Sequence, residues 1–215
     1  MKMPKLYQMS LLALGLALAG IASGANAACS PGALPAEANR VINTGRPDTA
    51  LFDAAVRYYA NVQRCKNGRA PFAADPNLLD AAVAHSKYMA KANNMTHEST
   101  QRGMRTLGDR MHKFQVAMRT AGENIAQNFV YALTGRPISA KTRGRCKFTY
   151  ANGQPVPAHS YASLAQEQVA NWMASPKHHK NLMNKRFNRI ATGLAYAPDN
   201  QTCGRIYMAQ DFAGG

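Results

Sequence analysis

Four cysteines, Cys29, Cys65, Cys146 and Cys203, constrain the fold of this chain more than any other feature of its sequence. An even number of cysteines in an exported protein indicates disulfide bonds, and four cysteines allow three connectivities. We favour Cys29–Cys65 with Cys146–Cys203, because each bond would tie down an otherwise loose segment and stabilise the fold by about 2–4 kcal/mol. A zinc site is the alternative, but no pair has the C-x-x-C spacing typical of one.

The N-terminus predicts the export that disulfide bonds require. Lys2 and Lys5 precede an apolar run at residues 11–21, and Ala25-Asn26-Ala27 follows as a cleavage site. A stable transmembrane helix needs about 20 apolar residues, so this run is too short, and no second apolar span occurs. We therefore predict a signal peptide at residues 1–27 and a secreted or periplasmic protein without a transmembrane segment.

The chain is strongly basic, with a formal charge of +15, which falls to +13 when the two lysines of the predicted signal peptide are removed. Its segment from Arg136 to Lys147 contains five Lys and Arg residues and no acid. Such a segment suits an anionic partner, and in an exported protein the phosphates or lipid head groups of an envelope are nearer than nucleic acid. The alternative is a solvated loop whose charge serves solubility.

Helical spacing of apolar residues and helix start signals occur mainly in the first two thirds of the chain. Asp48 and Asp75 are expected to cap the first two helices, and Pro76 suits the first helical position of the second. The four predicted helices run from Asp48 to Lys66–Gly68, from Asp75 to Asn93–Asn94, from Met104 to Phe114 and from Tyr161 to Ser175.

Strand signals occur mainly in the second half of the chain. Residues 125–131 show the alternation of a strand, residues 148–150 precede an Asn152-Gly153 turn, and residues 190–197 and 205–212 are predicted as two strands joined by a turn. Helices first and strands later favour an α+β fold with one antiparallel sheet covered by helices. After the signal peptide we expect a lead segment at residues 28–47 and one domain at residues 48–215.

A carboxylate and two histidine-containing segments offer the chemistry of a site. Glu123 lies in Ala121-Gly122-Glu123-Asn124-Ile125-Ala126, while His97 ends one segment upstream and His178 follows Trp172 downstream. Two imidazoles and one carboxylate with an open position could bind zinc and activate a water molecule. The alternative is a partly buried hydrogen-bond cluster that connects three segments, because a buried carboxylate needs donors. His85, on the apolar face of its helix, is expected in the core rather than as a ligand.

These segments, in this order, resemble the CAP superfamily, also called SCP-like, which comprises cysteine-rich secretory proteins, antigen 5 and pathogenesis-related proteins of group 1. The bacterial branch is the most similar. The matching residues are His97 after an Asn-rich helix end, 121–126, 169–172 with 175–182, 193–196 and 207–212. The resemblance implies a three-layer α-β-α sandwich with a central antiparallel sheet and a cavity.

The resemblance also places residues in that cavity, where eukaryotic members bring together two histidines and two glutamates. His97, Glu123 and His178 fall on three of these positions, but Ser175 replaces the second glutamate. Glu167 does not substitute for it, because it lies about 140° around its helix from Trp172 and is expected to face solvent.

Supporting roles follow for neighbouring residues of the predicted site. Asn124 and Asn181 could orient it through hydrogen bonds, or could instead cap a helix or lie at a strand edge. Trp172 is expected to anchor its helix to the sheet. We interpret the protein as a non-enzymatic binding module for an envelope, lipid-like or extracellular ligand. The alternative is a metal-dependent extracellular hydrolase that uses His97, Glu123 and His178; no serine or thiol nucleophile with a recognised pattern is present.

Overall fold

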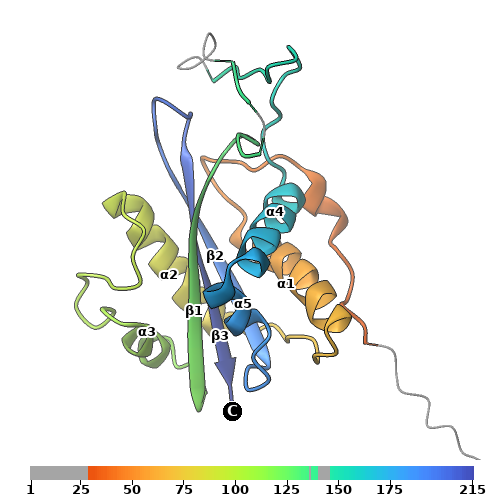
Figure 1. The fold of residues 1–215 in the computed structure, drawn as a ribbon. Coiled ribbons are helices and arrows are strands. Elements are labelled where there is room, and N and C mark those ends of the chain that lie inside the picture. Colours follow the sequence, from red (N-terminus) through yellow and green to blue (C-terminus); the bar gives the residue numbers. More distant parts are fainter. Residues whose placement is uncertain (1–28, 136, 140–145) are drawn as a thin grey trace, which may run out of the picture.

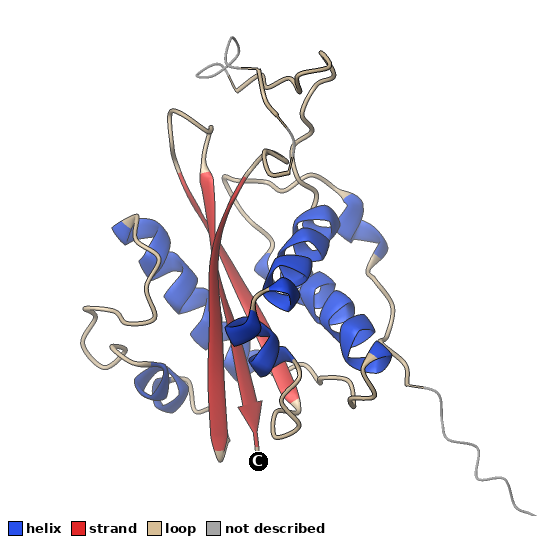
Figure 2. Ribbon diagram, viewed as in Figure 1, coloured by secondary structure: helices blue, strands red, loops and turns tan. Residues whose placement is uncertain are grey.

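A three-stranded antiparallel sheet forms the middle layer of the computed structural model, which describes residues 29–135, 137–139 and 146–215. The strands are β1 (Thr120–Phe129), β2 (Arg189–Ala197) and β3 (Arg205–Gly214), in the spatial order β1-β3-β2. Helices cover both faces of this sheet (Figures 1 and 2). The α+β sandwich expected from the sequence is therefore confirmed. The predicted signal peptide lies outside the described residues.

Two groups of helices form the outer layers. On one face lie α1 (Thr49–Lys66), α4 (Tyr161–Ala174) and α5 (Pro176–Leu182), while α2 (Pro76–Ala92) and α3 (Leu107–Lys113) cover the other (Figure 1). A short 3₁₀ helix, η1 (Ala36–Asn39), packs near α1 and α4. Among the described residues, no helix has the length and apolar character needed to cross a bilayer.

The predicted helix starts at Asp48 and Asp75 are confirmed, because their side chains accept hydrogen bonds from the backbone N–H groups of Leu51 and Leu78. The third helix begins later than expected. Thr106 forms a capping box with Asp109, so the preceding residues from Met104 stay outside the helix.

The predicted fourth helix is followed by a second one. Ser175 has an extended backbone (φ −94°, ψ 120°), which ends α4, and Pro176 begins α5. The cause is steric, because a residue before proline is pushed out of the helical region. The chain therefore changes direction between Trp172 and His178.

The described core has three apolar clusters, one large cluster on one face of the sheet and two smaller ones on the other. Trp172, Phe52 and Phe212 belong to the larger cluster, between the sheet and α1, α4 and α5. On the other face α2 lies so close to β2 that a Cβ atom on Gly193 would come within 2.4 Å of the Ala82 backbone. Only glycine permits this approach, which brings α2 near the carboxylates described below.

Both favoured disulfide bonds, Cys29–Cys65 and Cys146–Cys203, are present. The first ties the segment before η1 to the end of α1. The second joins the segment that returns to α4 with the β2–β3 connection. The short hairpin expected near Asn152-Gly153 is reduced to isolated bridges such as Thr149 with Pro155.

Candidate functional site

Glu123 lies inside β1 rather than before the strand, because β1 begins at Thr120. Its cross-strand neighbour on β3 is Asp211. The Glu123 side chain is 4% exposed and Asp211 is completely buried. Side chains of directly opposed residues lie on the same face of a sheet, so the register brings two buried carboxyl groups together.

Three basic side chains surround the Glu123 carboxylate. Arg110 Nη2 donates a hydrogen bond to Oε2 at 2.6 Å, and His97 Nδ1 lies 2.8 Å from Oε1. His85 Nε2 is 3.8 Å from Oε2 and donates to the Thr96 carbonyl at 2.8 Å. Arg110 also donates to the His97 carbonyl at 3.3 Å. We call Glu123, Asp211, Arg110, His97 and His85 the Glu123 cluster.

The charges in the Glu123 cluster favour a state in which Glu123 and Asp211 carry one proton between them. Arg110 is 1% exposed and pairs with Glu123, whereas neither oxygen of Asp211 has a hydrogen-bond partner among the described residues. Burial, followed by the negative charge of Glu123, raises the pKa of Asp211 well above its ordinary value. Burial also lowers the pKa of His85, which opposes a second buried cation. A proton in this pair is therefore favoured on Asp211 over Glu123.

The exposed edge of the Glu123 cluster is His97, whose side chain is 59% exposed. The hydrogen bond to Glu123 raises the pKa of His97 despite partial burial. Burial raises the pKa of Glu123, but the His97 hydrogen bond and the Arg110 charge outweigh burial and leave it lowered. The stabilising effect of protonated His97 is thus present below about pH 6.5 and is lost as pH rises through its elevated pKa.

Substituting Asp211 by asparagine tests this charge assignment. A carboxyl group with a raised pKa binds its proton more tightly in the folded state, so its presence lowers stability as pH rises above about 4. Asp211→Asn should therefore raise the free energy of unfolding by about 1–3 kcal/mol at pH 7 and by less at pH 4. Urea denaturation at the two pH values measures the difference. An equal effect at both would contradict the assignment.

A second group of polar residues fixes α5 to β1. Asn181 Nδ2 donates to the Glu123 carbonyl at 3.1 Å and to Asn124 Oδ1 at 2.8 Å. Asn124 Nδ2 donates to Gln210 Oε1 at 2.9 Å and to the His178 carbonyl at 3.4 Å. Asn124 and Asn181 therefore bond to each other, to Gln210 and to the carbonyls of Glu123 and His178, and none of these four bonds involves an imidazole.

The structure does not bring the His178 side chain to Glu123. Among the described residues it makes no hydrogen bond or ion pair with the Glu123 carboxylate. It lines a separate pocket of about 500 Å³ with Trp172 and Ser175. Burial, then the positive charges of His97 and Lys177, lowers the pKa of His178. Of the three candidate ligands, His97 and Glu123 are hydrogen-bonded, whereas His178 interacts with the charge of His97.

Trp172 lies where its predicted anchoring role requires, 1% exposed, with Nε1 donating to the Ile125 carbonyl at 3.4 Å. Glu167, expected to face solvent, is partly exposed, with 26% of its side chain accessible. Its carboxylate accepts hydrogen bonds from Asn128 Nδ2 at 3.0 Å and from Thr134 Oγ1 at 2.5 Å. The end of β1 and the chain that follows it cover this part of α4, so the residue is partly enclosed.

The Glu123 cluster does not fit a divalent metal as its residues lie. No group of three or more His, Cys, Asp or Glu residues in the described ranges is arranged to hold a metal ion. One oxygen of Glu123 is held by a guanidinium at 2.6 Å, and a metal ion there would meet a buried positive charge.

Three members of the Glu123 cluster, Arg110, Asp211 and His85, were not predicted as site residues, although His85 is buried as expected. A charged residue inside the apolar strand Ile206–Phe212 was the visible signal for Asp211. Arg110 carried no comparable signal, since its helix turn contains several polar residues.

Comparison with known proteins decides the family. A sequence model described as "CAP: Cysteine-rich secretory protein family" matches residues 40–212. This chain belongs to that family. The CAP chain is 27% identical over 158 residues to "Uncharacterized protein YkwD" of Bacillus subtilis (strain 168), which covers 74% of the chain and 48% of the relative. It is 39% identical over 70 residues to "Uncharacterized membrane protein YlbC" of the same organism, covering 33% and 20%. The chain thus spans less than half of these relatives.

Solved structures of bacterial surface and extracellular proteins are similar to the CAP chain. An extracellular protein containing a SCP domain from Bacillus anthracis has 24% identity and a TM-score of 0.48, with 76% of this chain and 40% of that chain covered. An outer surface protein from Borrelia burgdorferi has 16% identity and a TM-score of 0.49, covering 74% and 90%.

Proposed function

We propose that this CAP protein is an exported, non-enzymatic binding module that engages an anionic envelope, lipid-like or extracellular ligand. The observation that supports a role without catalysis is the buried ion pair between Arg110 and Glu123. A carboxylate held by a guanidinium and an imidazole is a poor general base, because its pKa is lowered. In this proposal the Glu123 cluster has a structural role, because it connects β1, β3, α2, α3 and the His97 segment. The ligand binds at another surface of the protein.

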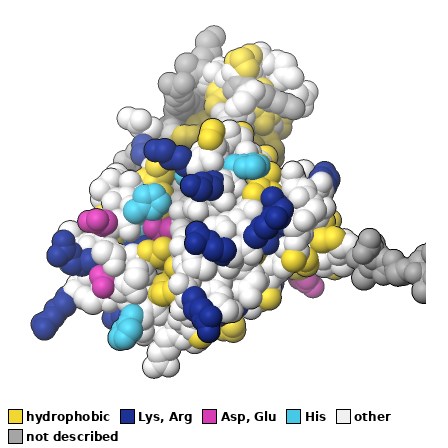
Figure 3. Space-filling model, turned by 60° about the horizontal axis from the view of Figure 1, so that its bottom comes forward, with side chains coloured by type: hydrophobic (Ala, Val, Ile, Leu, Met, Phe, Trp, Pro, Cys, Tyr) yellow, Lys and Arg dark blue, Asp and Glu magenta, His cyan; other side chains and the backbone are white. Residues whose placement is uncertain are grey.

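A basic surface supports the choice of an anionic partner. No acid occurs between Glu167 and Asp199. Within that stretch, α5 and the turn after it carry four exposed cations, which we call the α5 basic surface: Lys177, Lys180, Lys185 and Arg186. Figure 3 shows a face on which Lys and Arg side chains are spread among few acidic ones. Of the basic segment expected at 136–147, Arg136, Lys141, Arg143 and Arg145 lie outside the described residues, and Lys147 is exposed.

Vesicle binding tests this proposal. The protein should sediment with vesicles that contain phosphatidylglycerol and not with phosphatidylcholine alone, and low salt should strengthen binding. Lys180→Glu/Lys185→Glu should weaken it by about tenfold or more, since each cation near an anionic surface contributes about 1 kcal/mol. The matched control Lys66→Glu/Lys91→Glu makes the same charge change at exposed positions on α1 and α2.

An equal loss of vesicle binding in the two double variants would show that only the net charge of the protein matters. That result would contradict a binding site at α5. Binding that ignores salt and lipid charge would contradict the anionic partner itself.

A further inference from the structure

The pocket of about 500 Å³ that His178 lines borders the free edge of β1, and we call it the β1-edge pocket. β1 is an outer strand that pairs with β3 alone, so its other edge is not covered by a strand (Figure 1). The lining contains no Lys, Arg, Asp or Glu, although the chain as a whole is strongly basic. The volume is within the range of about 300–1,000 Å³ typical of small-ligand sites.

Polar side chains in the β1-edge pocket lack partners. Five of them make no hydrogen bond with any described residue: Gln127, Gln168, Asn171, Ser175 and His178. Gln168 is the most informative, because it is only 4% exposed and buried amides are normally hydrogen-bonded. Its polar atoms keep some accessible surface, unlike Nε2 of Gln210, which is both unpartnered and fully enclosed. A ligand in the pocket can therefore reach the Gln168 amide.

The backbone of Gln127 adds a donor and an acceptor at the same edge. The carbonyls of Glu123 and Ile125 point away from β3, because they accept hydrogen bonds from Asn181 Nδ2 at 3.1 Å and Trp172 Nε1 at 3.4 Å. Backbone groups two residues apart in a strand point to the same side, so the N–H and C=O of Gln127 point to this edge as well. No loop or side chain among the described residues bonds to them. An added strand pairs with such groups.

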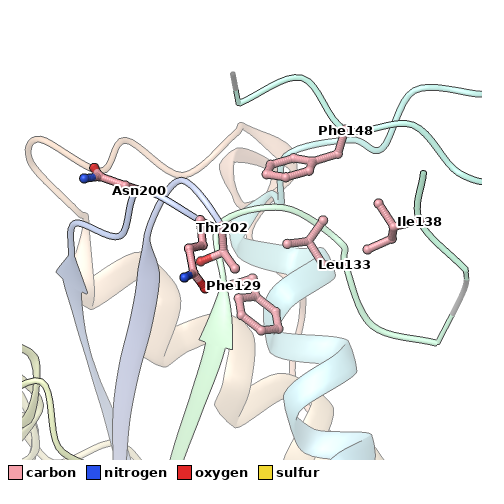
Figure 4. Close-up of a pocket in the computed structure, with 7 residues that line it drawn as sticks. Phe129, Leu133, Ile138, Phe148, Asn200 and Thr202 are labelled. Atoms are coloured by element: carbon pink, nitrogen blue, oxygen red, sulfur yellow. The ribbon is translucent and has the colours of Figure 1, made fainter. Parts of the chain in front are cut away.

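A larger pocket of about 700 Å³ lies at the end of the sheet and differs in this respect. Figure 4 shows the apolar side chains of Leu133, Ile138 and Phe148 in its wall, with Thr202 on the β2–β3 connection. The hydroxyl of Thr202 is unpartnered but fully enclosed, so a ligand in that pocket does not reach it. Of these two pockets, the β1-edge pocket is the one that offers a buried polar group to a ligand.

We propose that the β1-edge pocket binds a short uncharged peptide in extended form. One peptide group pairs with the backbone N–H and C=O of Gln127, and a neighbouring one contacts the Gln168 amide, which can both donate and accept. The uncharged lining suits a neutral ligand, and Met95, 50% exposed, can contact a small apolar side chain. The inference goes beyond the proposed function, because this ligand differs in charge and in place from the partner of the α5 basic surface.

Titration of the isotope-labelled, oxidised protein with N-acetyl-trialanine amide, followed by NMR, tests the proposal. The backbone N–H of Gln127 and the side-chain amide of Gln168 should shift saturably, with a dissociation constant of about 0.1–1 mM. Gln168→Leu should weaken binding about fivefold or more, through loss of the amide. The same variant should leave the urea midpoint unchanged or raise it, because the replaced amide has no partner in the protein.

The matched control is Gln166→Leu, at an exposed glutamine of α4 outside the β1-edge pocket, and it should bind the peptide as the wild type does. Gln127→Pro removes the backbone N–H at an edge strand, where proline is tolerated, and should also weaken binding. Lys180→Glu/Lys185→Glu should not affect it, so failure of the vesicle proposal is separable from failure of this one.

Saturable shifts that Gln168→Leu weakens and Gln166→Leu does not would support the peptide site. Absence of saturable shifts, or equal weakening by the two leucine variants, would overturn it. Saturable binding of N-acetylglucosamine without binding of the blocked peptide would also overturn it, since the pocket would then recognise a sugar-borne amide.

Discussion

Replacing Arg110 by methionine should lower the free energy of unfolding by about 3–5 kcal/mol at pH 7. The substitution keeps an unbranched apolar stem and removes the guanidinium that pairs with Glu123. Glu123 and Asp211 would then remain buried with only histidines near them, and isolated buried charge is strongly unfavourable. Urea denaturation of the oxidised protein measures the loss.

Two further variants separate charge from packing in this experiment. Arg110→Met combined with Glu123→Gln and Asp211→Asn removes both acids with the cation and should recover most of the lost stability. Arg40→Met removes a guanidinium from an exposed ion pair with Asp48, with side chains 51% and 39% exposed, and should cost less than about 1 kcal/mol. A loss at Arg110 no larger than that at Arg40 would contradict a charge-compensated core.

Replacing Trp172 by alanine should lower the free energy of unfolding by a similar amount, about 3–5 kcal/mol. The indole is 1% exposed within the larger core cluster, and its N–H is the donor to the Ile125 carbonyl at the edge of the sheet. Alanine would leave a cavity and an unpaired buried carbonyl. Thermal and urea unfolding followed by circular dichroism both report the change.

Trp172→Phe provides the comparison, because phenylalanine keeps most of the apolar surface and lacks the N–H donor. We expect a loss of about 1–2 kcal/mol for this variant, mainly from the hydrogen bond and the smaller ring. If phenylalanine cost as much as alanine, the hydrogen bond to Ile125 rather than burial would be the dominant contribution of Trp172.

The sequence predicted helix and strand positions well where a single residue determines the local structure. Asp48 and Asp75 start helices because a carboxylate satisfies free N–H groups within three residues, and this requirement is visible in the sequence. The strand predicted at residues 205–212 is β3, which extends to Gly214. The cysteine pairs followed from the need to tie down loose segments. The proline after Ser175 indicated the end of α4. It did not indicate that a second helix, α5, begins at Pro176 in a new direction.

The candidate site was predicted only in part, because its decisive pair depends on strand register. Glu123 and Asp211 are far apart in the sequence and meet because β1 and β3 pair with Glu123 opposite Asp211. A shift of one residue would place them on opposite faces of the sheet. Family order placed His97 and Glu123 in one cavity, and the two side chains are hydrogen-bonded. It did not reveal that Arg110 lies beside the same carboxylate.

The most direct measurement is the zinc stoichiometry of the oxidised protein, obtained by elemental analysis together with native mass spectrometry. If Arg110 compensates Glu123, the wild-type protein should retain no stoichiometric zinc after dialysis. His97→Ala, His178→Ala and Glu123→Gln should leave this result unchanged. About one zinc ion per chain, lost in those three variants, would contradict a structural cluster and would support a metal site formed by His97, Glu123 and His178.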